Sequence, residues 1–292
     1  MEKRITVFTP TYNRKYILPK LYDSLCCQER KDFLWLIVDD GSTDGTEELV
    51  RQWMSDSVLD IEYHYQENRG KMAAHNEGVR LCTTELFVCV DSDDLLASPS
   101  VIGDTLDFWD KNNSVAQLET TSGMVSYRKM VSKKQCYFPE NVKLATLSAI
   151  NESGFDGETT LVYKTNILRK YPFPVVEGEK FITEDIVYDQ IDLCYKMLVF
   201  PYYSQVCEYQ PGGYTCNGWD VLFKNPKGYR KYYNQCIKLR RGSRSYNMRM
   251  YIACSLIAGD GRTFAESDFK LLLLLMFPLG LYQYHRLCHK KW

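Results

Sequence analysis

Three carboxylates stand close together directly after a short apolar run. Asp91, Asp93 and Asp94 surround Ser92 and follow residues 86–90. Two carboxylates one residue apart on a turn can both approach one divalent cation. Mg²⁺ and Mn²⁺ prefer such oxygen ligands, and proteins usually hold them with one or two carboxylates plus substrate phosphates. The alternative is that Asp93 or Asp94 caps a following turn while the other acids are solvated.

A second acidic pair, Glu184 and Asp185, stands at the start of an apolar-periodic segment that predicts a helix from residue 186 to about 197. A carboxylate within hydrogen-bonding reach of a hydroxyl can act as a general base. Acids at a helix N-terminus also offset the helix dipole, so the pair has both interpretations.

Strands and helices alternate over the first 95 residues, and this pattern predicts the elements that must position these acids. The predicted strands cover residues 5–8, 33–38, 61–65 and 86–90, and the predicted helices cover 16–28, 46–54 and the stretch from 71 to 82. Such alternation predicts an α/β fold with a mainly parallel sheet covered on both faces. Ligands of these sheets bind beyond the carboxyl ends of the strands, where all the polar clusters of this region lie.

The pattern is weaker beyond residue 95. Residues 112–151 are polar, and their elements cannot be ordered. Strands are expected at 159–163 and 202–209, followed by the glycine-containing turn 210–214. Further helices are expected at 226–241 and 246–257.

Four motifs occur in a fixed order at these strand ends: Phe8-Thr9-Pro10-Thr11-Tyr12-Asn13-Arg14, Val38-Asp39-Asp40-Gly41-Ser42-Thr43-Asp44, Asn68-Arg69-Gly70 with Asn76-Glu77-Gly78, and Val90-Asp91-Ser92-Asp93-Asp94. With these motifs the sequence resembles a family 2 inverting glycosyltransferase of the GT-A fold, similar to enzymes that build bacterial surface polysaccharides. The resemblance is dense over the first 95 residues and looser to about residue 215.

The resemblance implies a binding site for a nucleotide-sugar donor and, more specifically, for a UDP-sugar. Thr9, Pro10 and Tyr12 would line the base pocket, and Asp39 or Asp40 would accept a hydrogen bond from uracil N3–H. Arg69 and Lys71 would reach the diphosphate, and Asn76 and Ser92 would join the donor site. Turn capping is the alternative for the two aspartates, and a solvated charge is the alternative for the two cations.

The resemblance also implies the chemistry. Asp93 would be the principal ligand of Mn²⁺ or Mg²⁺, and Asp91 would contact the ribose or the metal. The metal would stabilise the departing nucleoside diphosphate. Asp185, with Glu184 beside it, would be the general base that activates a hydroxyl of a saccharide acceptor. The chain lacks the Gln-x-x-Arg-Trp signature of processive members, which favours the addition of a single sugar.

Three other classes of protein are alternatives to this interpretation. A phosphatase with an Asp-x-Asp nucleophile would carry that motif after its first strand, whereas here it follows the fourth. A nicotinamide-dependent enzyme would need Gly-x-Gly-x-x-Gly after the first strand, where this chain has Thr9-Pro10-Thr11-Tyr12-Asn13. A non-catalytic partner subunit of a glycosyltransferase complex stays as the alternative function.

Composition indicates an ordinary globular protein with reduced thiols. The 292 residues are 45% hydrophobic and 25% charged. The eleven cysteines form no Cys-x-x-Cys pair, several lie in apolar runs, and no secretory segment opens the chain. These features predict a cytoplasmic location.

Charge is divided unevenly between the two predicted regions, a GT-A domain over residues 1–218 and a basic helical region over 219–292. Residues 221–292 hold fourteen Lys or Arg against three acids, a formal charge of +11 in a chain whose total is −1. Residues 271–282 are uncharged but shorter than the roughly 20 residues that span a bilayer. We therefore expect peripheral attachment to the inner face of the membrane and a lipid-linked acceptor, in preference to nucleic acid. A basic helical cap packed on the acidic domain is the alternative.

Overall fold

The computed structural model describes residues 2–131, 136–207 and 218–290. The chain divides into two compact units, Met1–Pro172 with Val187–Glu208 and Phe173–Ile186 with Tyr209–Trp292. The domain boundary expected between residues 218 and 219 stays a prediction, because residues 208–217 lie outside the described residues.

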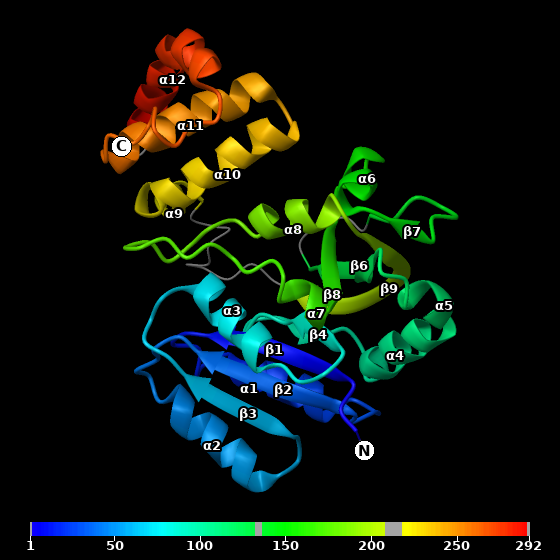
Figure 1. Cartoon of the computed structure of the whole chain (residues 1–292). Coiled ribbons are helices and arrows are strands. Elements are labelled where there is room, and N and C mark those ends of the chain that lie inside the picture. The colour runs from blue at the N-terminus through cyan, green and yellow to red at the C-terminus, as the bar shows by residue number, and fades with distance from the viewer. Residues whose placement is uncertain (1, 132–135, 208–217, 291–292) are drawn as a thin grey trace. The chain divides into compact units, whose positions relative to one another are not determined.

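One mixed sheet forms the centre of the first unit (Figure 1). Its strand order is β3-β2-β1-β4-β8-β6-β9-β5, and β7 pairs with β9. The first four strands are mutually parallel, β6 is parallel to β9, and β8 lies antiparallel between β4 and β6. The expected α/β sheet is therefore confirmed, but it is mixed rather than mainly parallel, because β5, β7 and β8 pair antiparallel with their neighbours. The strands are β1 (Ile5–Thr11), β2 (Phe33–Asp39), β3 (Ile61–Tyr65), β4 (Leu86–Cys89), β5 (Leu95–Leu96), β6 (Thr121–Met130), β7 (Leu144–Ala145), β8 (Glu158–Lys164) and β9 (Lys196–Cys207).

Helices cover both faces of this sheet (Figure 1). On one face, α1, α2 and α4 pack against alternate strand residues such as Val7 and Trp35. On the other face, His75 of α3 makes edge contacts with the rings of Phe8 and Phe87. The helices of this part of the chain are α1 (Leu18–Cys26), α2 (Thr46–Asp56), α3 (Lys71–Leu81), α4 (Val101–Lys111), α5 (Asn113–Ala116), α6 (Leu147–Glu152), α7 (Thr165–Leu168) and α8 (Asp185–Asp192).

Two elements differ from the sequence-based expectation. The polar stretch 112–151 contains β6, a strand of the sheet interior that pairs with both β8 and β9. The helix expected to reach residue 197 ends at Asp192, and β9 begins at Lys196 rather than at Tyr202. The reason is tertiary: Met197, Leu198 and Val199 pair with β6 and are buried, so sheet pairing overrides the helical periodicity.

The second unit is helical. It contains α9 (Gly218–Lys224), α10 (Pro226–Leu239), α11 (Arg244–Ala258) and α12 (Lys270–Lys290), and the predicted helices after residue 226 are confirmed. Its core gathers apolar side chains of all four helices, among them Leu222, Ile237, Ile252 and Leu273. By length and apolar composition alone, one helix within the described part of the chain, Lys270–His289, qualifies as a candidate for crossing a membrane.

A buried arginine ties this helical unit together. Arg230 of α10 is 2% exposed, and its guanidinium donates to both carboxylate oxygens of Asp260 at 2.7 and 2.9 Å. It also lies 2.7 Å from Glu266. The hydrogen bonds from Arg230 are the main cause that lowers the pKa of Asp260 to about 2. Two of the three acids after residue 221 are therefore bound by one internal cation.

Asp260→Asn is expected to destabilise the protein by about 2 kcal/mol at pH 7, because a lowered carboxylate pKa is a stability contribution of about 1.4 kcal/mol per unit. That contribution is present above the ordinary pKa of aspartate and is lost as pH falls toward 2. Urea unfolding between pH 7 and pH 3 should therefore show the wild-type and variant curves converging as acidity increases. Asp220→Asn, which alters an exposed acid of α9, serves as the control and should change stability by less than about 0.5 kcal/mol. A constant difference across this pH range would contradict the assignment.

Candidate active site

The loops after β1 and β2 are joined by reciprocal hydrogen bonds. The backbone N–H of Asn13 donates to Ser42 Oγ at 2.8 Å, and the backbone N–H of Thr43 donates to Asn13 Oδ1 at 2.8 Å. Asn13 has a positive φ of 53°, a conformation that asparagine tolerates better than most residues. Two motifs that are about 30 residues apart in the sequence thus form one surface at the carboxyl edge of the sheet.

Asp39, the last residue of β2, and Asp40, which follows it, are both buried and engaged in hydrogen bonds. Asp39 accepts from the backbone N–H of Ser42 at 2.7 Å and from the Tyr63 hydroxyl at 2.8 Å. These contacts realise the turn-capping alternative. A carboxylate has about four acceptor sites, so Asp39 retains capacity for a further donor, and its predicted contact with the base stays a prediction.

Asp40 organises the loop that leads into α3. It accepts from the backbone N–H groups of Arg69 and Gly70 at 2.8 and 2.7 Å, and from the Gln66 side chain at 2.7 Å. Gly70 has a φ of 92°, which strongly favours glycine at this position. With three donors already bound, Asp40 is less suited than Asp39 to contact a base.

The acidic motif after β4 meets three cations. Lys71, the first residue of α3, lies 2.8 Å from Asp91. The Arg14 guanidinium is 4.0 Å from Asp93, and the Arg128 guanidinium is 3.7 Å from Asp94. Each carboxylate of the motif therefore faces a positive charge that comes from a different part of the chain.

Burial and these cations set the charge states of the three acids. Burial alone would raise the pKa of Asp91, but Lys71 and Arg128 outweigh it and hold the pKa below its ordinary value. Burial and the nearby Asp91 raise the pKa of Asp93. Burial, opposed by Arg128, raises the pKa of Asp94 to about 7. The three cations therefore do not fully stabilise the negative charge of the three carboxylates.

The other predicted donor-site residues lie at the same edge with different exposure. Pro10 and Ser92 are buried, Asn76 is half-buried, and Tyr12 is 49% exposed. Arg69 is exposed and forms no salt bridge within the described residues. Their contacts with a donor stay predictions.

Thr9 has a structural role. Its side chain is fully buried, and its Oγ accepts a hydrogen bond from the Trp35 indole at 3.0 Å. The hydroxyl is thereby occupied within the core. The predicted pocket role of Thr9 stays a prediction.

Arg128 lies against the acidic motif of the candidate site, and the sequence pattern does not reveal it. It stands on β6, opposite Glu158 of β8 and Gln205 of β9. Gln205 is fully buried and donates from Nε2 to the backbone carbonyl of Cys89, the last residue of β4, at 2.9 Å. Both residues depend on the pairing of β6 with its neighbours, which no local motif signals.

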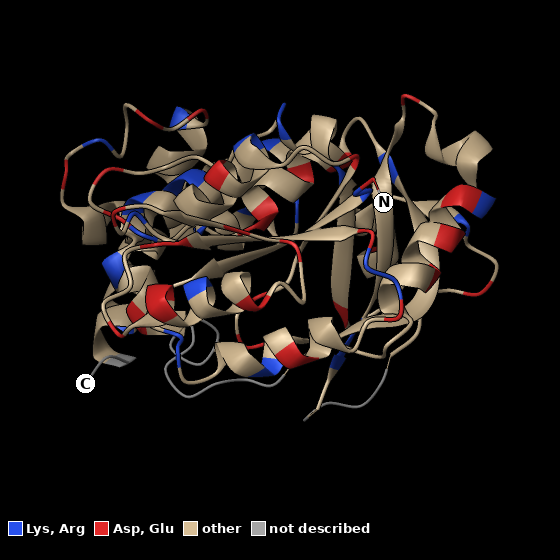
Figure 2. Cartoon of the chain, turned by 90° about the horizontal axis from the view of Figure 1, so that it is seen from below, with Lys and Arg blue, Asp and Glu red and all other residues tan. Residues whose placement is uncertain are grey.

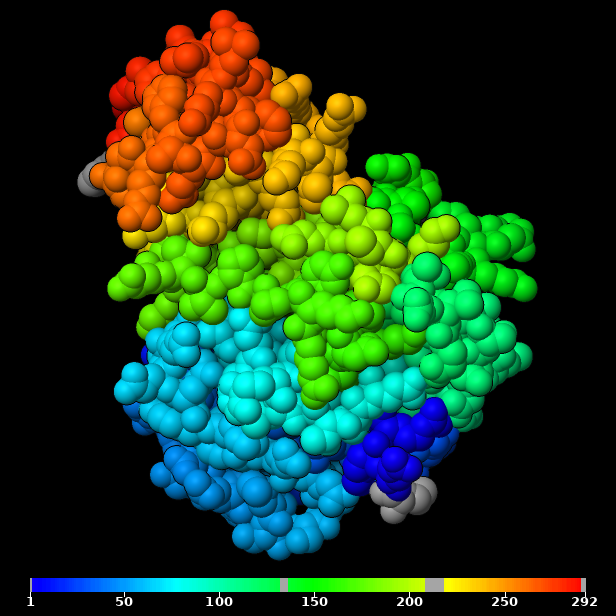
Figure 3. Space-filling model, in the orientation of Figure 1, coloured from blue at the N-terminus to red at the C-terminus, as the bar shows by residue number. Residues whose placement is uncertain are grey.

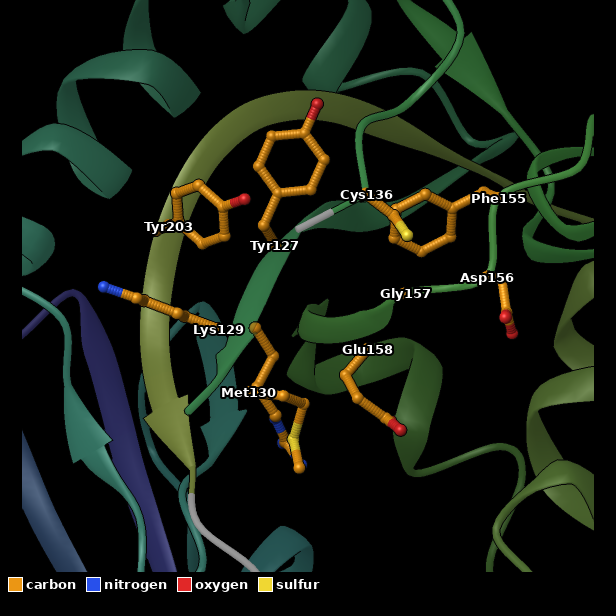
Figure 4. A pocket seen from close by; sticks show the side chains of 10 residues that line it. Tyr127, Lys129, Met130, Cys136, Phe155, Asp156, Gly157, Glu158 and Tyr203 are labelled. Atoms are coloured by element: carbon orange, nitrogen blue, oxygen red, sulfur yellow. The ribbon is translucent and has the colours of Figure 1, made fainter. Parts of the chain in front are cut away.

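A pocket adjoins Arg128 where β6, β8 and β9 lie side by side (Figure 4). The rings of Tyr127 and Tyr203 have centroids 5.0 Å apart. Glu158 and Met130 lie away from these rings in the same pocket (Figure 4). Aromatic, apolar and acidic groups therefore line it: Tyr127, Arg128, Lys129, Met130, Cys136, Phe155, Asp156, Gly157, Glu158 and Tyr203.

The predicted base belongs to the second unit. Asp185 begins α8 and is solvent-exposed, and it accepts a long hydrogen bond from the Tyr232 hydroxyl at 3.5 Å. Partial desolvation of the carboxyl atoms and the adjacent Glu184 raise the pKa of Asp185. The glycine-containing turn at 210–214 lies outside the described residues.

Comparison with known proteins gives consistent results. Residues 6–171 match the family described as Glycosyl transferase family 2. Glycosyltransferase GlyA of Streptococcus pneumoniae is 38% identical over 96 residues, which are 32% of this chain and 13% of that protein. The chain aligns with only 13% to 18% of the length of the first three curated relatives.

Two solved structures share the fold over nearly the whole chain. A 1–349 fragment of S. aureus TarS has a TM-score of 0.62 at 19% identity, covering 97% of this chain and 90% of the fragment. The mannosyltransferase PcManGT from Pyrobaculum calidifontis, in complex with GDP-Man and Mn²⁺, has a TM-score of 0.55 at 20% identity, covering 99% and 83%. The expected GT-A type of α/β fold with C-terminal helices is confirmed. Because the family match covers more than half of the chain and includes the strand-end motifs, the chain belongs to glycosyl transferase family 2.

Proposed function

We propose that the chain transfers a single sugar, with inversion, from a UDP-sugar to a hydroxyl of a saccharide acceptor. The observation that carries this proposal is the cluster of Asp91, Asp93 and Asp94 at the end of β4, each facing a cation from another segment. Carboxylates for a divalent metal and cations for a diphosphate are the two charged groups that donor binding requires.

Asp91 and Asp93 suit Mn²⁺ or Mg²⁺ by the chemistry of their oxygens, although the described residues contain no group of three or more His, Cys, Asp or Glu side chains that could hold a metal ion. Both metals prefer carboxylate oxygens and complete their coordination with phosphate and water. The raised pKa of Asp93 and the buried Asp94 Oδ2, which has no hydrogen-bond partner, indicate negative charge that a cation would stabilise. Asp93 and Asp91 would hold the metal, which when bound supplies Lewis-acid stabilisation to the leaving diphosphate.

The donor is proposed to be a UDP-sugar. Asp39 retains acceptor capacity for a base N–H. Tyr12 offers an exposed ring in the loop after β1, which is joined through Asn13 to the loop after β2. The TarS fragment has also been solved in complexes with UDP-GlcNAc and with UDP, which supports a uridine nucleotide.

The acceptor is proposed to bind at the mouth of the pocket of Figure 4, whose interior has room only for water-sized groups. The half-buried Tyr203 ring can pack on the apolar face of a sugar, and the half-buried Glu158 can accept hydrogen bonds from its hydroxyls. Arg128 contacts the acidic cluster and also lines this pocket, so donor and acceptor would meet beside it.

Asp185 is the proposed general base. It would take the proton of the acceptor hydroxyl while that oxygen attacks C1 of the donor sugar. The bond between C1 and the diphosphate oxygen would break on the opposite side, and its electron pair would leave with UDP. The positive charges of Lys71, Arg14 and Arg128 would stabilise the charge that develops on the departing group.

Thermal unfolding of the purified chain tests donor binding. UDP with Mn²⁺ at about 100 times its Kd should stabilise the protein by about 2.7 kcal/mol and raise Tm by several degrees, whereas UDP alone, Mn²⁺ alone and GDP with Mn²⁺ should have smaller effects. No shift with any nucleotide at millimolar concentration would reject the proposal. Stabilisation without Mn²⁺-dependent release of UDP from any UDP-sugar would favour a non-catalytic partner subunit.

A further inference from the structure

Helix α12 presents a continuous apolar face to solvent. Leu271, Leu274, Leu275, Leu279 and Tyr282, here called the leucine face, are between 50% and 73% exposed. Their spacing follows the helical repeat, so they form one stripe along the helix. Soluble proteins seldom leave so many large apolar side chains together on one surface unless a partner covers them.

The opposite side of α12 is buried, which fixes the direction of the leucine face. Leu273, Gln283 and Leu287 are at most 1% exposed. At Gly280 the helix approaches α11 so closely that a Cβ atom would lie 2.5 Å from Ile252. The helix therefore cannot rotate to bury its leucines without losing these contacts. The orange and red part of the surface in Figure 3 belongs to α11, α12 and the segment that joins them.

Positive charge flanks the leucine face. Lys270 precedes it, Arg286 follows it, and both side chains are exposed. The three acids after residue 221 all face cations: Asp260 and Glu266 lie against Arg230, and Asp268 is 4.0 Å from Lys238. Charged side chains of both signs are spread over the whole chain (Figure 2), but the surplus beyond residue 221 is positive.

The geometry favours a helix that lies on a bilayer over one that crosses it. The segment from Leu271 to Tyr282 has twelve residues, which extend for about 18 Å at 1.5 Å per residue. The hydrocarbon core is about 30 Å thick. The remaining turns carry the exposed His285, Arg286 and His289, which are suited to lipid headgroups rather than to acyl chains.

We propose that the leucine face of α12 inserts into the surface of a bilayer that contains anionic lipids. The apolar side chains enter to the boundary between headgroups and acyl chains, and Lys270 and Arg286 contact the anionic headgroups. This would place the protein peripherally on the cytoplasmic leaflet. A protein at this surface would act on an acceptor saccharide that is linked to a lipid. This step alone rests on the proposed function.

Flotation of the purified full chain with vesicles tests the membrane contact. The chain should float with vesicles of phosphatidylcholine and phosphatidylglycerol (7:3) and much less with phosphatidylcholine alone. The triple substitution Leu271→Ser, Leu275→Ser and Leu279→Ser should lower the apparent vesicle affinity more than tenfold. Lys270→Glu with Arg286→Glu should lower it specifically for the anionic vesicles, with a smaller salt dependence.

A second triple variant, with three exposed apolar side chains replaced outside α12, controls for the loss of apolar surface elsewhere on the protein. Val58→Ser, Leu118→Ser and Val175→Ser alter side chains that are 46% to 53% exposed outside α12 and should float like the wild type. Helix content by circular dichroism should be unchanged in every variant. Equal flotation of the two triple variants, or no flotation of the wild type, would overturn the proposal. A dimer that dissociates in the α12 variant without any vesicle binding would do the same and would assign the face to a second copy.

The result of the flotation experiment does not depend on the donor site. Binding of UDP with Mn²⁺ should be the same in the wild type and the α12 variant, because the substitutions leave the acidic cluster intact. Vesicle binding without nucleotide binding would reject the proposed function and retain the membrane contact. Nucleotide binding without vesicle binding would do the reverse.

Discussion

Replacing Asp93 with asparagine is expected to reduce sugar transfer by a factor of about 10² to 10³, since metal stabilisation of a leaving group contributes several kcal/mol. The side chain keeps its size but loses the charge that would bind Mn²⁺. The affinity for UDP in the presence of Mn²⁺, measured by titration calorimetry, should fall along with the rate. Without Mn²⁺, the Asp93→Asn variant should bind UDP about as weakly as the wild type does.

Two measurements separate this effect from misfolding. Burial and Asp91 raise the pKa of Asp93, so its charge is unfavourable in the ligand-free protein. Asp93→Asn should therefore unfold at the same temperature as the wild type or slightly higher. Asp56→Asn, at an exposed position at the end of α2, is the matched control and should leave transfer unchanged. A transfer rate within threefold of the wild type in Asp93→Asn would remove this residue from the site.

Asp185→Asn is expected to lower kcat by about 10² to 10⁴, the range that general-base catalysis contributes, without a change in donor affinity. The asparagine can still accept a hydrogen bond from the acceptor hydroxyl but cannot take its proton. Single-turnover transfer at saturating donor and acceptor measures the step directly. Thermal stabilisation by UDP with Mn²⁺ should match the wild type.

Glu184→Gln distinguishes the two neighbouring carboxylates. The negative charge of Glu184 contributes to the raised pKa of Asp185, so its removal should lower that pKa. The acidic limb of the pH–rate profile should then move to lower pH, while the maximal rate stays within about tenfold. A large loss in Glu184→Gln with normal kcat in Asp185→Asn would exchange the roles of the two residues.

The sequence predicts the first half of the sheet well because its signals are local. The strands near Val7, Ile37 and Val88 are apolar runs that end in polar turns, and each is followed by a helical repeat. The ordered motifs at these strand ends also predict the family that the comparison shows. Asp91 and Lys71 were both predicted for the donor site, and the structure brings them to 2.8 Å.

The remainder depends on contacts between distant segments. Arg128 reaches Asp94 because β6 pairs with β8 and β9, and its own stretch of sequence is polar and irregular. The hydrogen bonds of Asp40 show the same dependence, because its donors come from residues 66–70. A sequence motif identifies an acid such as Asp40. It does not show whether that carboxylate contacts a ligand or accepts hydrogen bonds from the protein itself.

The pairing of each acid after β4 with its own cation has a consequence for the order of binding. Three cations face three acids, of which Asp94, with a pKa of about 7, is only partly ionised at neutral pH, so the cluster has little net negative charge with which to attract a free metal ion over a distance. The complex of a divalent cation with the diphosphate of a UDP-sugar carries almost no net charge and needs no such attraction. Capture of that preformed complex should therefore proceed at a rate that ionic strength hardly alters.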